Sequence, residues 1–208
     1  MKALTRRRVL AMAMAGALLP WGVRAETASD VRAPIITLYG ALEKVMKAGA
    51  TTSFKARFDM LAPVIDQVFD LAVILQVSVG LRWNGLDEAA KATLMASFRR
   101  FTVASYVANF ATYDGEVFEV GTDLRTIGND QVVPTKMVRR TGEPTRLDYV
   151  MRQTPSGWRV VDVLLDGTIS RVAVQRSDFR GLLSRGDTTA LIDSLNRKIA
   201  DLSGGALG

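Results

Sequence analysis

Few residue types in this sequence could carry chemistry, because its 208 residues include neither cysteine nor histidine. Without them the chain has no thiol nucleophile, no disulfide, no thiolate or histidine zinc ligand and no Ser-His-Asp triad. The remaining catalytic candidates are Asp148 and Asp162 on neighbouring expected strands, with Tyr149 beside the first. In an apolar pocket they could serve a small isomerase or dehydratase as acid and base. The alternative is that Asp162 and Asp166 stabilise the hairpin and the turn that follows it.

The balance of charges gives no indication of a nucleic-acid partner. The whole chain has 27 basic and 21 acidic residues, but five of the basic ones precede Glu26. The rest are interleaved with acidic residues, whereas a nucleic-acid surface requires a clustered basic face. We therefore expect an ordinary mixed surface. Because cysteine and histidine ligands are missing, we also expect no metal site.

The N-terminus has the pattern of an export signal. Basic residues up to Arg8 precede an apolar run at 9–19, and small or tolerated residues precede Glu26. We expect residues 1–25 to be a signal peptide and residues 26–208 to form one exported domain. The paired arginines fit a twin-arginine signal or an ordinary basic segment, so both export routes remain open.

The helical spacing of apolar residues predicts that the first half of the exported domain is helical. The expected helices span 34 to about 47, a segment capped by Thr51 or Thr52, a segment started by Pro63 at 64–77, and 86–113. The third is apolar around most of its circumference. Such a helix is buried on more than one side, either in the core or against an apolar ligand.

The second half has the pattern of a strand meander. The expected strands are 116–125, 130–140, 145–153 and 158–165, and they are joined by short turn-forming loops. Such loops connect antiparallel neighbours. Helices at 170–183 and 188 to about 202 follow, and Gly204-Gly205 indicates a loose tail. The pattern predicts one α+β domain, with helices packed around a twisted antiparallel sheet.

Several stretches resemble a known family. The sequence Trp-Arg-Val-Val-Asp-Val-Leu-Leu-Asp-Gly at 158–167, followed by a helix with Gln-Arg-Ser-Asp-Phe at 175–179, resembles the MlaC/toluene-tolerance family of periplasmic phospholipid-binding proteins. More closely, the segments at 69–71, 78–83 and 164–174 are similar to its hopanoid-associated branch, HpnM. The resemblance covers nearly the whole exported domain.

This resemblance implies an NTF2-like arrangement in which a pocket between sheet and helices takes lipid acyl chains. It implies a soluble periplasmic carrier that binds a phospholipid or hopanoid. The implied partners are an ABC-type inner-membrane transporter complex and an outer-membrane lipoprotein complex. ATP would be consumed by the transporter, so we expect no cofactor on this chain, and we expect a monomer.

Apolar residues on the helices and on the last hairpin are the candidates for the pocket wall. They are Val68, Phe69, Leu75, Phe98 and Phe110 on the helices, and Leu147, Tyr149, Met151, Val161, Val163 and Leu165 on the hairpin. Alternation along a strand predicts one face for 147, 149 and 151, and one face for 161, 163 and 165. Ordinary core packing explains each of them equally well, and a chain with a filled interior would be an adaptor without a ligand.

Three arginines are candidates for a phosphate contact at the mouth of such a pocket: Arg82, Arg139 and Arg171. No glycine-rich phosphate cradle accompanies them. The alternative is that they are ordinary surface residues.

Overall fold

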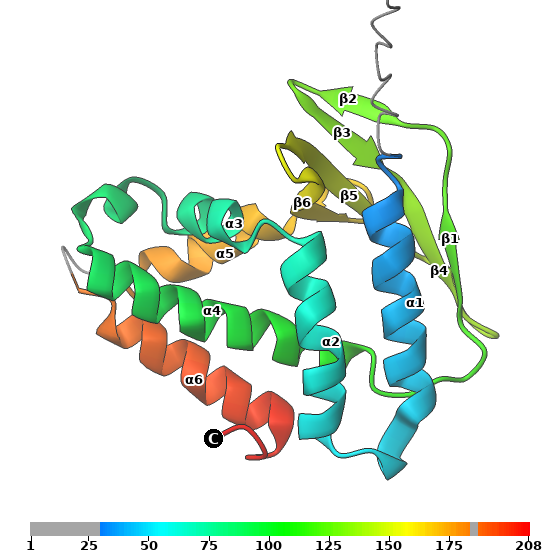
Figure 1. Cartoon of the computed structure of the whole chain (residues 1–208), viewed down its shortest axis with the longest axis horizontal. Helices are drawn as coiled ribbons and strands as arrows, with labels where there is room; N and C mark the ends of the chain where they lie inside the picture. Colours follow the sequence, from blue (N-terminus) through cyan, green and yellow to red (C-terminus); the bar gives the residue numbers. More distant parts are fainter. Residues whose placement is uncertain (1–29, 184–186) are drawn as a thin grey trace, which may run out of the picture.

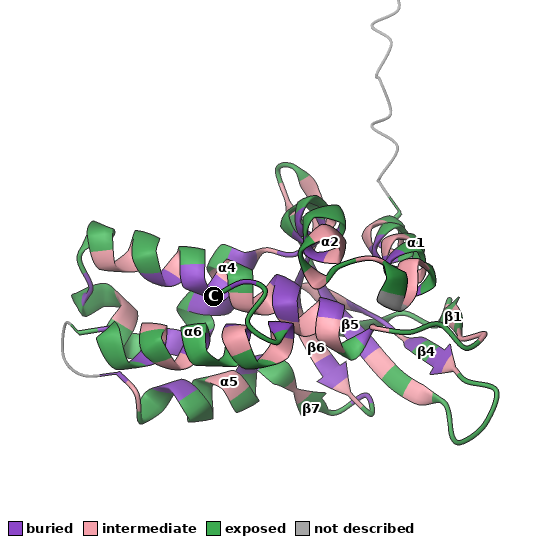
Figure 2. Ribbon diagram, turned by 90° about the horizontal axis from the view of Figure 1, so that it is seen from below, coloured by how far each residue is buried: buried purple, intermediate pink, exposed green. Residues whose placement is uncertain are grey.

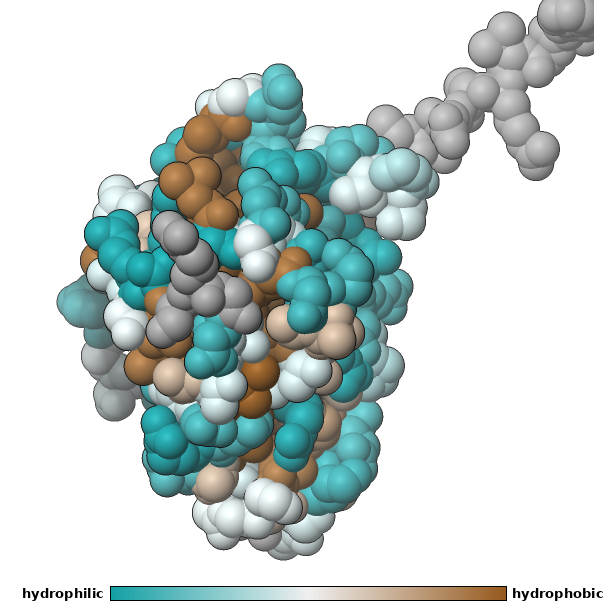
Figure 3. Space-filling view, turned by 90° about the vertical axis from the view of Figure 1, so that its left-hand side faces the viewer, coloured by the Kyte–Doolittle hydropathy of each residue, from teal (hydrophilic) through white to brown (hydrophobic). Residues whose placement is uncertain are grey.

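The computed structural model describes residues 30–183 and 187–208. The expected signal peptide, residues 1–25, lies outside the described residues. The described chain combines helices with an antiparallel sheet, which confirms the α+β prediction (Figure 1). None of its helices is long and apolar enough to cross a membrane. The end of the molecule at the left of Figure 1 carries hydrophobic residues in separate groups among hydrophilic ones (Figure 3).

The helices form two groups around the sheet. The α-helices are α1 (Ala33–Ala48), α2 (Phe54–Val68), α3 (Leu71–Val79), α4 (Glu88–Asn109), α5 (Arg171–Arg180) and α6 (Thr189–Ser203), and the 3-10 helices are η1 (Gly49–Thr51) and η2 (Gly80–Gly85). Figure 1 shows α1 in front of β1 and β4, with α2 beside it. At the other end α4 lies along α6, and buried residues occupy their facing sides (Figure 2).

The sheet is built on the long hairpin of β5 and β6. The strands are β1 (Val117–Val120), β2 (Arg125–Ile127), β3 (Asp130–Val133), β4 (Thr135–Val138), β5 (Thr145–Thr154), β6 (Gly157–Leu165) and β7 (Ile169–Ser170). Their order is β1-β4-β5-β3-β2, with β6 on the other edge of β5 and β7 beside β6. All pairs are antiparallel, so the predicted meander is confirmed.

The break between the second and third helices differs from the prediction. Pro63 lies inside α2, and the helix is capped by Ser53 rather than by Thr51 or Thr52. A proline inside a helix removes one backbone hydrogen bond, which a well-buried helix can tolerate at a cost.

The helix ends instead after Val68, where the next residues contact the sheet. The peptide N–H of Asp70 donates to the carbonyl of Val160 on β6 at 2.9 Å, and Phe69 forms a parallel bridge with the same residue. The Asp70 carboxylate then accepts the N–H of Val73 at 3.0 Å and caps α3. The sheet edge therefore determines where α2 ends.

Each of the first two expected strands is split. Pro134 divides the segment 130–140 into β3 and β4, because proline cannot donate to a strand neighbour. The Pro134 carbonyl accepts the N–H of Gly121, between β1 and β2. Both halves pair with the same edge of β5, at Val133↔Tyr149 and Lys136↔Arg146.

The predicted loose tail is wrong, because the C-terminal residues are packed. Gly204 adopts a left-handed conformation with φ of 58°, and the N–H of Gly205 donates to the Ala200 carbonyl at 2.9 Å, which closes α6. Leu207 is buried, and its carbonyl accepts a hydrogen bond from Arg100 on α4. The expected extension of α5 to residue 183 is also wrong, since α5 ends at Arg180.

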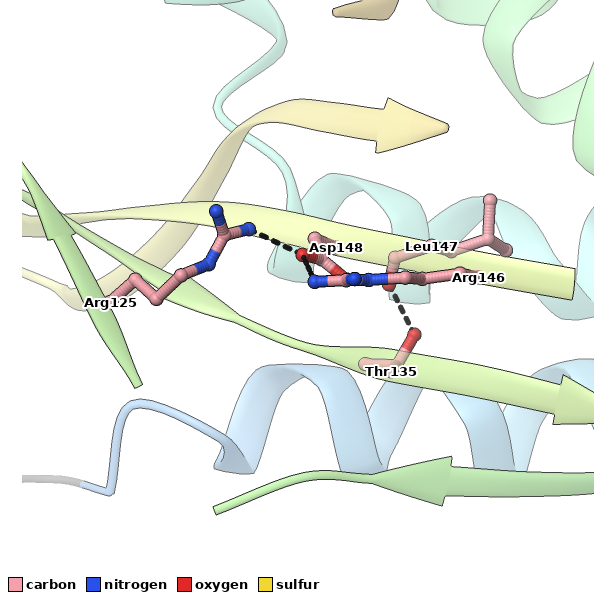
Figure 4. Close-up of polar contacts among 5 residues, drawn as sticks. All are labelled: Arg125, Thr135, Arg146, Leu147 and Asp148. Atoms are coloured by element: carbon pink, nitrogen blue, oxygen red, sulfur yellow. Dashed lines mark hydrogen bonds and ion pairs between the residues drawn. The ribbon is translucent and has the colours of Figure 1, made fainter. Parts of the chain in front are cut away.

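An ion cluster stabilises the outer face of the sheet (Figure 4). Asp148 is fully buried and accepts two hydrogen bonds from Arg146, at 2.9 and 2.8 Å, and a third from Arg125. Both arginine side chains are about half exposed, so they also keep water contacts. The cluster satisfies a carboxylate that would otherwise be buried without a partner.

Replacing this carboxylate should destabilise the fold. We expect Asp148→Asn to lower the free energy of unfolding by roughly 3 kcal/mol, because the buried amide cannot satisfy both guanidinium groups. Urea denaturation followed by circular dichroism would measure the change. The matched control is Asp59→Asn, which removes an exposed ion pair with Lys55 and should leave stability nearly unchanged. Equal midpoints for the two variants would contradict the assigned role of Asp148.

Candidate functional site

A cavity of about 480 Å³ lies between the inner face of the sheet and the helices. Its wall is formed by α3, the second half of α4, strands β4 to β6 and the first turns of α5. Most of the lining is apolar: Phe69, Leu71, Ile74, Phe98, Phe101, Tyr106, Phe110, Met137, Leu147, Tyr149, Val163, Leu165 and Val172. The arrangement provides an apolar container that is open to solvent on one side.

The structure places the expected wall residues in three environments. Those that line the cavity are Phe69, Phe98, Phe110, Leu147, Tyr149, Val163 and Leu165. Val68, Leu75 and Met151 are fully buried in the main core without reaching it. Val161 belongs to a separate cluster with Val132, Val150 and Leu164 on the outer face. For these last four residues, the predicted place on the wall is wrong.

A β-bulge explains why Val161 points away. Leu147 pairs with Leu165 and Tyr149 with Val163, as simple alternation requires. The register then shifts, so that Met151 pairs with Val160 and Val161 is the extra residue. A bulge interrupts the alternation of side chains between the two faces. The two runs of alternating residues therefore share a face only on the side of the bulge that contains Leu147, Tyr149, Val163 and Leu165.

Several other lining residues are not identified as cavity residues by the sequence patterns. Leu71 and Ile74 belong to the segment that is apolar all round, and Phe101 and Tyr106 belong to the long helix. Their spacing marks them as buried but does not distinguish core from cavity. Met137 is on β4, which was expected only as part of a longer strand.

Two tyrosines, Tyr106 and Tyr149, line the cavity, and a third, Tyr39, packs behind Tyr149. Tyr39 on α1 lies edge-on to Tyr149 at 5.9 Å between ring centroids, and its hydroxyl is hydrogen-bonded to that of Thr135. The Tyr149 hydroxyl is buried and has no hydrogen-bond partner in the described chain. Burial is the main cause that raises the pKa of Tyr39, Tyr106 and Tyr149. The phenols therefore stay neutral near pH 7, and the floor carries no charge.

The mouth of the cavity carries two of the three candidate arginines. Arg139 and Arg171 both line it, and Arg139 donates to the Thr145 hydroxyl at 2.9 Å. Arg82 lies elsewhere and donates to the carbonyl of Arg180 at 3.0 Å. Asp162 is the acidic residue among those that line the cavity. A cationic mouth above an apolar floor suits a ligand with an anionic head and a hydrocarbon tail.

The two carboxylates proposed as an acid–base pair have separate sets of bonding partners. Asp148 belongs to the ion cluster on the outer face, next to Tyr149 on the inner face. Asp162 accepts hydrogen bonds from the Ser170 hydroxyl and from the N–H groups of Val163 and Val172, so it anchors the start of α5. The described residues also contain no group of three or more acidic side chains that could hold a metal ion.

One solved structure with this fold is the phospholipid-binding protein from Ralstonia solanacearum, determined in complex with a phospholipid. It superimposes with a TM-score of 0.72 at 20% sequence identity, covering 84% of this chain and 99% of the other. No curated protein sequence matched the chain. The family model described as MlaC protein matches residues 38–197, which is well over half of the sequence. The chain therefore belongs to the MlaC family.

Proposed function

We propose that this protein is a periplasmic lipid carrier that holds acyl-chain surface of a glycerophospholipid, about one chain's worth, in its cavity. The observation that carries the proposal is the apolar cavity with a cationic mouth and an uncharged floor. Membership of the MlaC family and the phospholipid held by the Ralstonia solanacearum protein support it. An acid–base enzyme is less well supported, because the Asp148 carboxylate is bound by Arg125 and Arg146, whereas the Asp162 carboxylate is bound by Ser170 and the start of α5.

The apolar wall explains how a lipid can be held without a specific motif. Each buried methylene contributes roughly 0.8 kcal/mol, and this contribution has no directional requirement. Residues such as Phe98, Phe110 and Val163 need only supply apolar area and depth. The head group would remain at the mouth, where the phosphate could accept hydrogen bonds from Arg139 and Arg171.

The proposed cycle follows from the resemblance of the sequence to lipid carriers. The predicted signal peptide would deliver the chain to the periplasm. There the protein would act as a monomer without a cofactor and exchange lipid with an inner-membrane ABC-type transporter complex and an outer-membrane lipoprotein complex. ATP would be consumed by the transporter.

The similarity of residues 164–174 to the hopanoid-associated branch makes a hopanoid the competing cargo. A hopanoid is a fused-ring lipid without a phosphate group, so it would leave the guanidinium groups of Arg139 and Arg171 without an anionic partner. We therefore favour a glycerophospholipid. Native mass spectrometry and lipid extraction, on protein purified from its own periplasm without detergent, would identify the cargo. A bare mass after incubation with both lipid classes would contradict the carrier proposal.

A charge in the middle of the wall should abolish lipid retention. Val163 faces the cavity opposite Tyr149, so Val163→Asp places a carboxylate where a hydrocarbon tail would lie. We expect co-purified lipid to be lost while the helical circular dichroism signal persists, because burying an unpaired charge beside a tail is costly. The control is Val117→Asp on the exposed edge of β1, which should retain lipid. Full retention by the Val163 variant would exclude this cavity as the binding site.

Removing the mouth cations should weaken binding of anionic phospholipids. We expect Arg139→Gln with Arg171→Gln to raise the Kd for phosphatidylglycerol roughly tenfold or more, since a hydrogen bond to a charged group contributes about 1.5–3 kcal/mol. Displacement of a fluorescent phospholipid at low and high salt would measure it, and the wild-type advantage should shrink at high salt. Arg82→Gln is the control, because Arg82 lies away from the cavity. Equal affinities for all variants would place the head group elsewhere.

A further inference from the structure

A second cavity lies against the inner end of the first. It has a volume of about 390 Å³, and Phe69 and Leu71 line both cavities. It is also lined by Ala72 and Met95 and by the polar residues Asp66, Asp70, Arg99, Thr154, Ser156 and Arg159. We call it the outer cavity. The side chains of Phe69 and Leu71 therefore form the partition between two hollow spaces.

Phe69 lies at the end of the first cavity that is farthest from its mouth. Arg171 at the mouth follows β7, which pairs with β6 at Leu165. Phe69 bridges to the same strand at Val160. These positions on β6 are five residues apart, which corresponds to roughly 16 Å along a strand. A chain that enters beside Arg171 and follows β6 would reach Phe69 last.

The partition is held firmly in place. The N–H of Phe69 donates to the carbonyl of Ile65 at 3.0 Å, and the adjacent N–H of Asp70 is bonded to Val160. The Phe69 ring packs at 5.5 Å from the ring of Tyr106, and the residue is 4% exposed. Backbone and ring are both fixed, so Phe69 acts as a rigid wall.

The outer cavity could accept hydrocarbon if this wall were removed. Its charged side chains already have partners in the protein: Arg99 forms two hydrogen bonds with the Asp66 carboxylate, at 2.7 and 2.6 Å, and Arg159 donates to the Asp66 carbonyl at 2.7 Å. The Asp70 carboxylate accepts the N–H of Val73. Phe69, Leu71, Ala72 and Met95 are its apolar lining residues, and Thr154 and Ser156 add hydroxyl groups. A methyl end arriving past residue 69 would meet Leu71, Ala72 and Met95.

We propose that Phe69 is the end stop that sets the longest acyl chain this protein can cover completely. The proposal rests on the proposed function, since it assigns a length limit to the same lipid site. In the wild type, additional methylenes beyond the stop cannot enter and gain no burial. In a variant without the ring, they enter the outer cavity.

The test measures the Kd of wild type and Phe69→Ala for phosphatidylglycerols with lauroyl, myristoyl, palmitoyl and stearoyl chains. For wild type we expect affinity to rise with length and then reach a plateau. For the variant we expect the rise to continue to longer chains, by up to about fourfold per additional buried methylene. Phe69→Leu leaves a smaller obstruction and should give an intermediate limit, which keeps the test informative if the alanine variant folds poorly.

Two further variants separate the end stop from general loosening of the fold. Val68→Ala removes a buried side chain that lines neither cavity, so it should lower stability without moving the plateau. Ala72 lines only the outer cavity, and the second variant, Ala72→Phe, enlarges its side chain there. Combined with Phe69→Ala it should refill the new space and restore the wild-type plateau, while alone it should leave the plateau unchanged.

The outcomes distinguish the end stop from the carrier function. A wild type that binds lipids with a plateau that none of the Phe69 variants moves overturns the end stop and leaves the carrier function standing. A wild type that binds none of the lipids overturns both. A shift that Val68→Ala reproduces would also overturn the end stop, because core loosening would then explain it.

Discussion

The cavity depends on one backbone contact, the hydrogen bond from the N–H of Asp70 to the carbonyl of Val160. The outer edge of β6 pairs with β7 only at residues 164 and 165, so its earlier part would otherwise present unpaired groups. The α2–α3 junction occupies that edge and at the same time positions Phe69 against the cavity. The contact therefore joins the helical half of the molecule to the sheet and closes the inner end of the cavity.

An open apolar cavity has a cost that the rest of the fold must offset. Protein interiors are normally close-packed, and each unfilled volume loses contacts and stability. Here the stabilising contacts lie around the cavity: the core between α4 and α6 at Leu94 and Leu195, and the ion cluster of Asp148. A ligand that binds only the folded state stabilises it, so bound lipid should restore part of the stability that the unfilled cavity costs.

Local signals made much of the fold predictable. Asp87 caps α4 through the N–H of Ala90, which is typical of an acidic residue before a helical pattern, and β6 spans the apolar run that follows Gly157. The split at Pro134 was also within reach, because proline in an expected central strand argues against an unbroken strand.

What could not be predicted depends on contacts between distant segments. The end of α2 is set by Val160, which lies far along the chain from Phe69, and no pattern near Pro63 indicates it. The bulge at Val161 likewise appears only when the strand register is known. The hypothesis that Asp148 and Tyr149 act in one pocket could have been rejected from the sequence, because neighbouring residues on a strand point to opposite faces. Core and cavity residues share the same apolar character, so the sequence alone does not show that Val68 lies in the core and Phe69 at the cavity.

Selectivity in such a site must come from its two ends. The wall between them binds hydrocarbon by area alone, and it accepts any tail of suitable width. At roughly 30 Å³ for a group the size of a water molecule, a cavity of about 480 Å³ has room for approximately one long chain. Complete burial of two such chains would exceed the strongest non-covalent affinities, at roughly 0.8 kcal/mol per methylene. A carrier that must release its cargo therefore benefits from a cavity of limited depth, bounded by Phe69 inside and by Arg139 and Arg171 at the mouth.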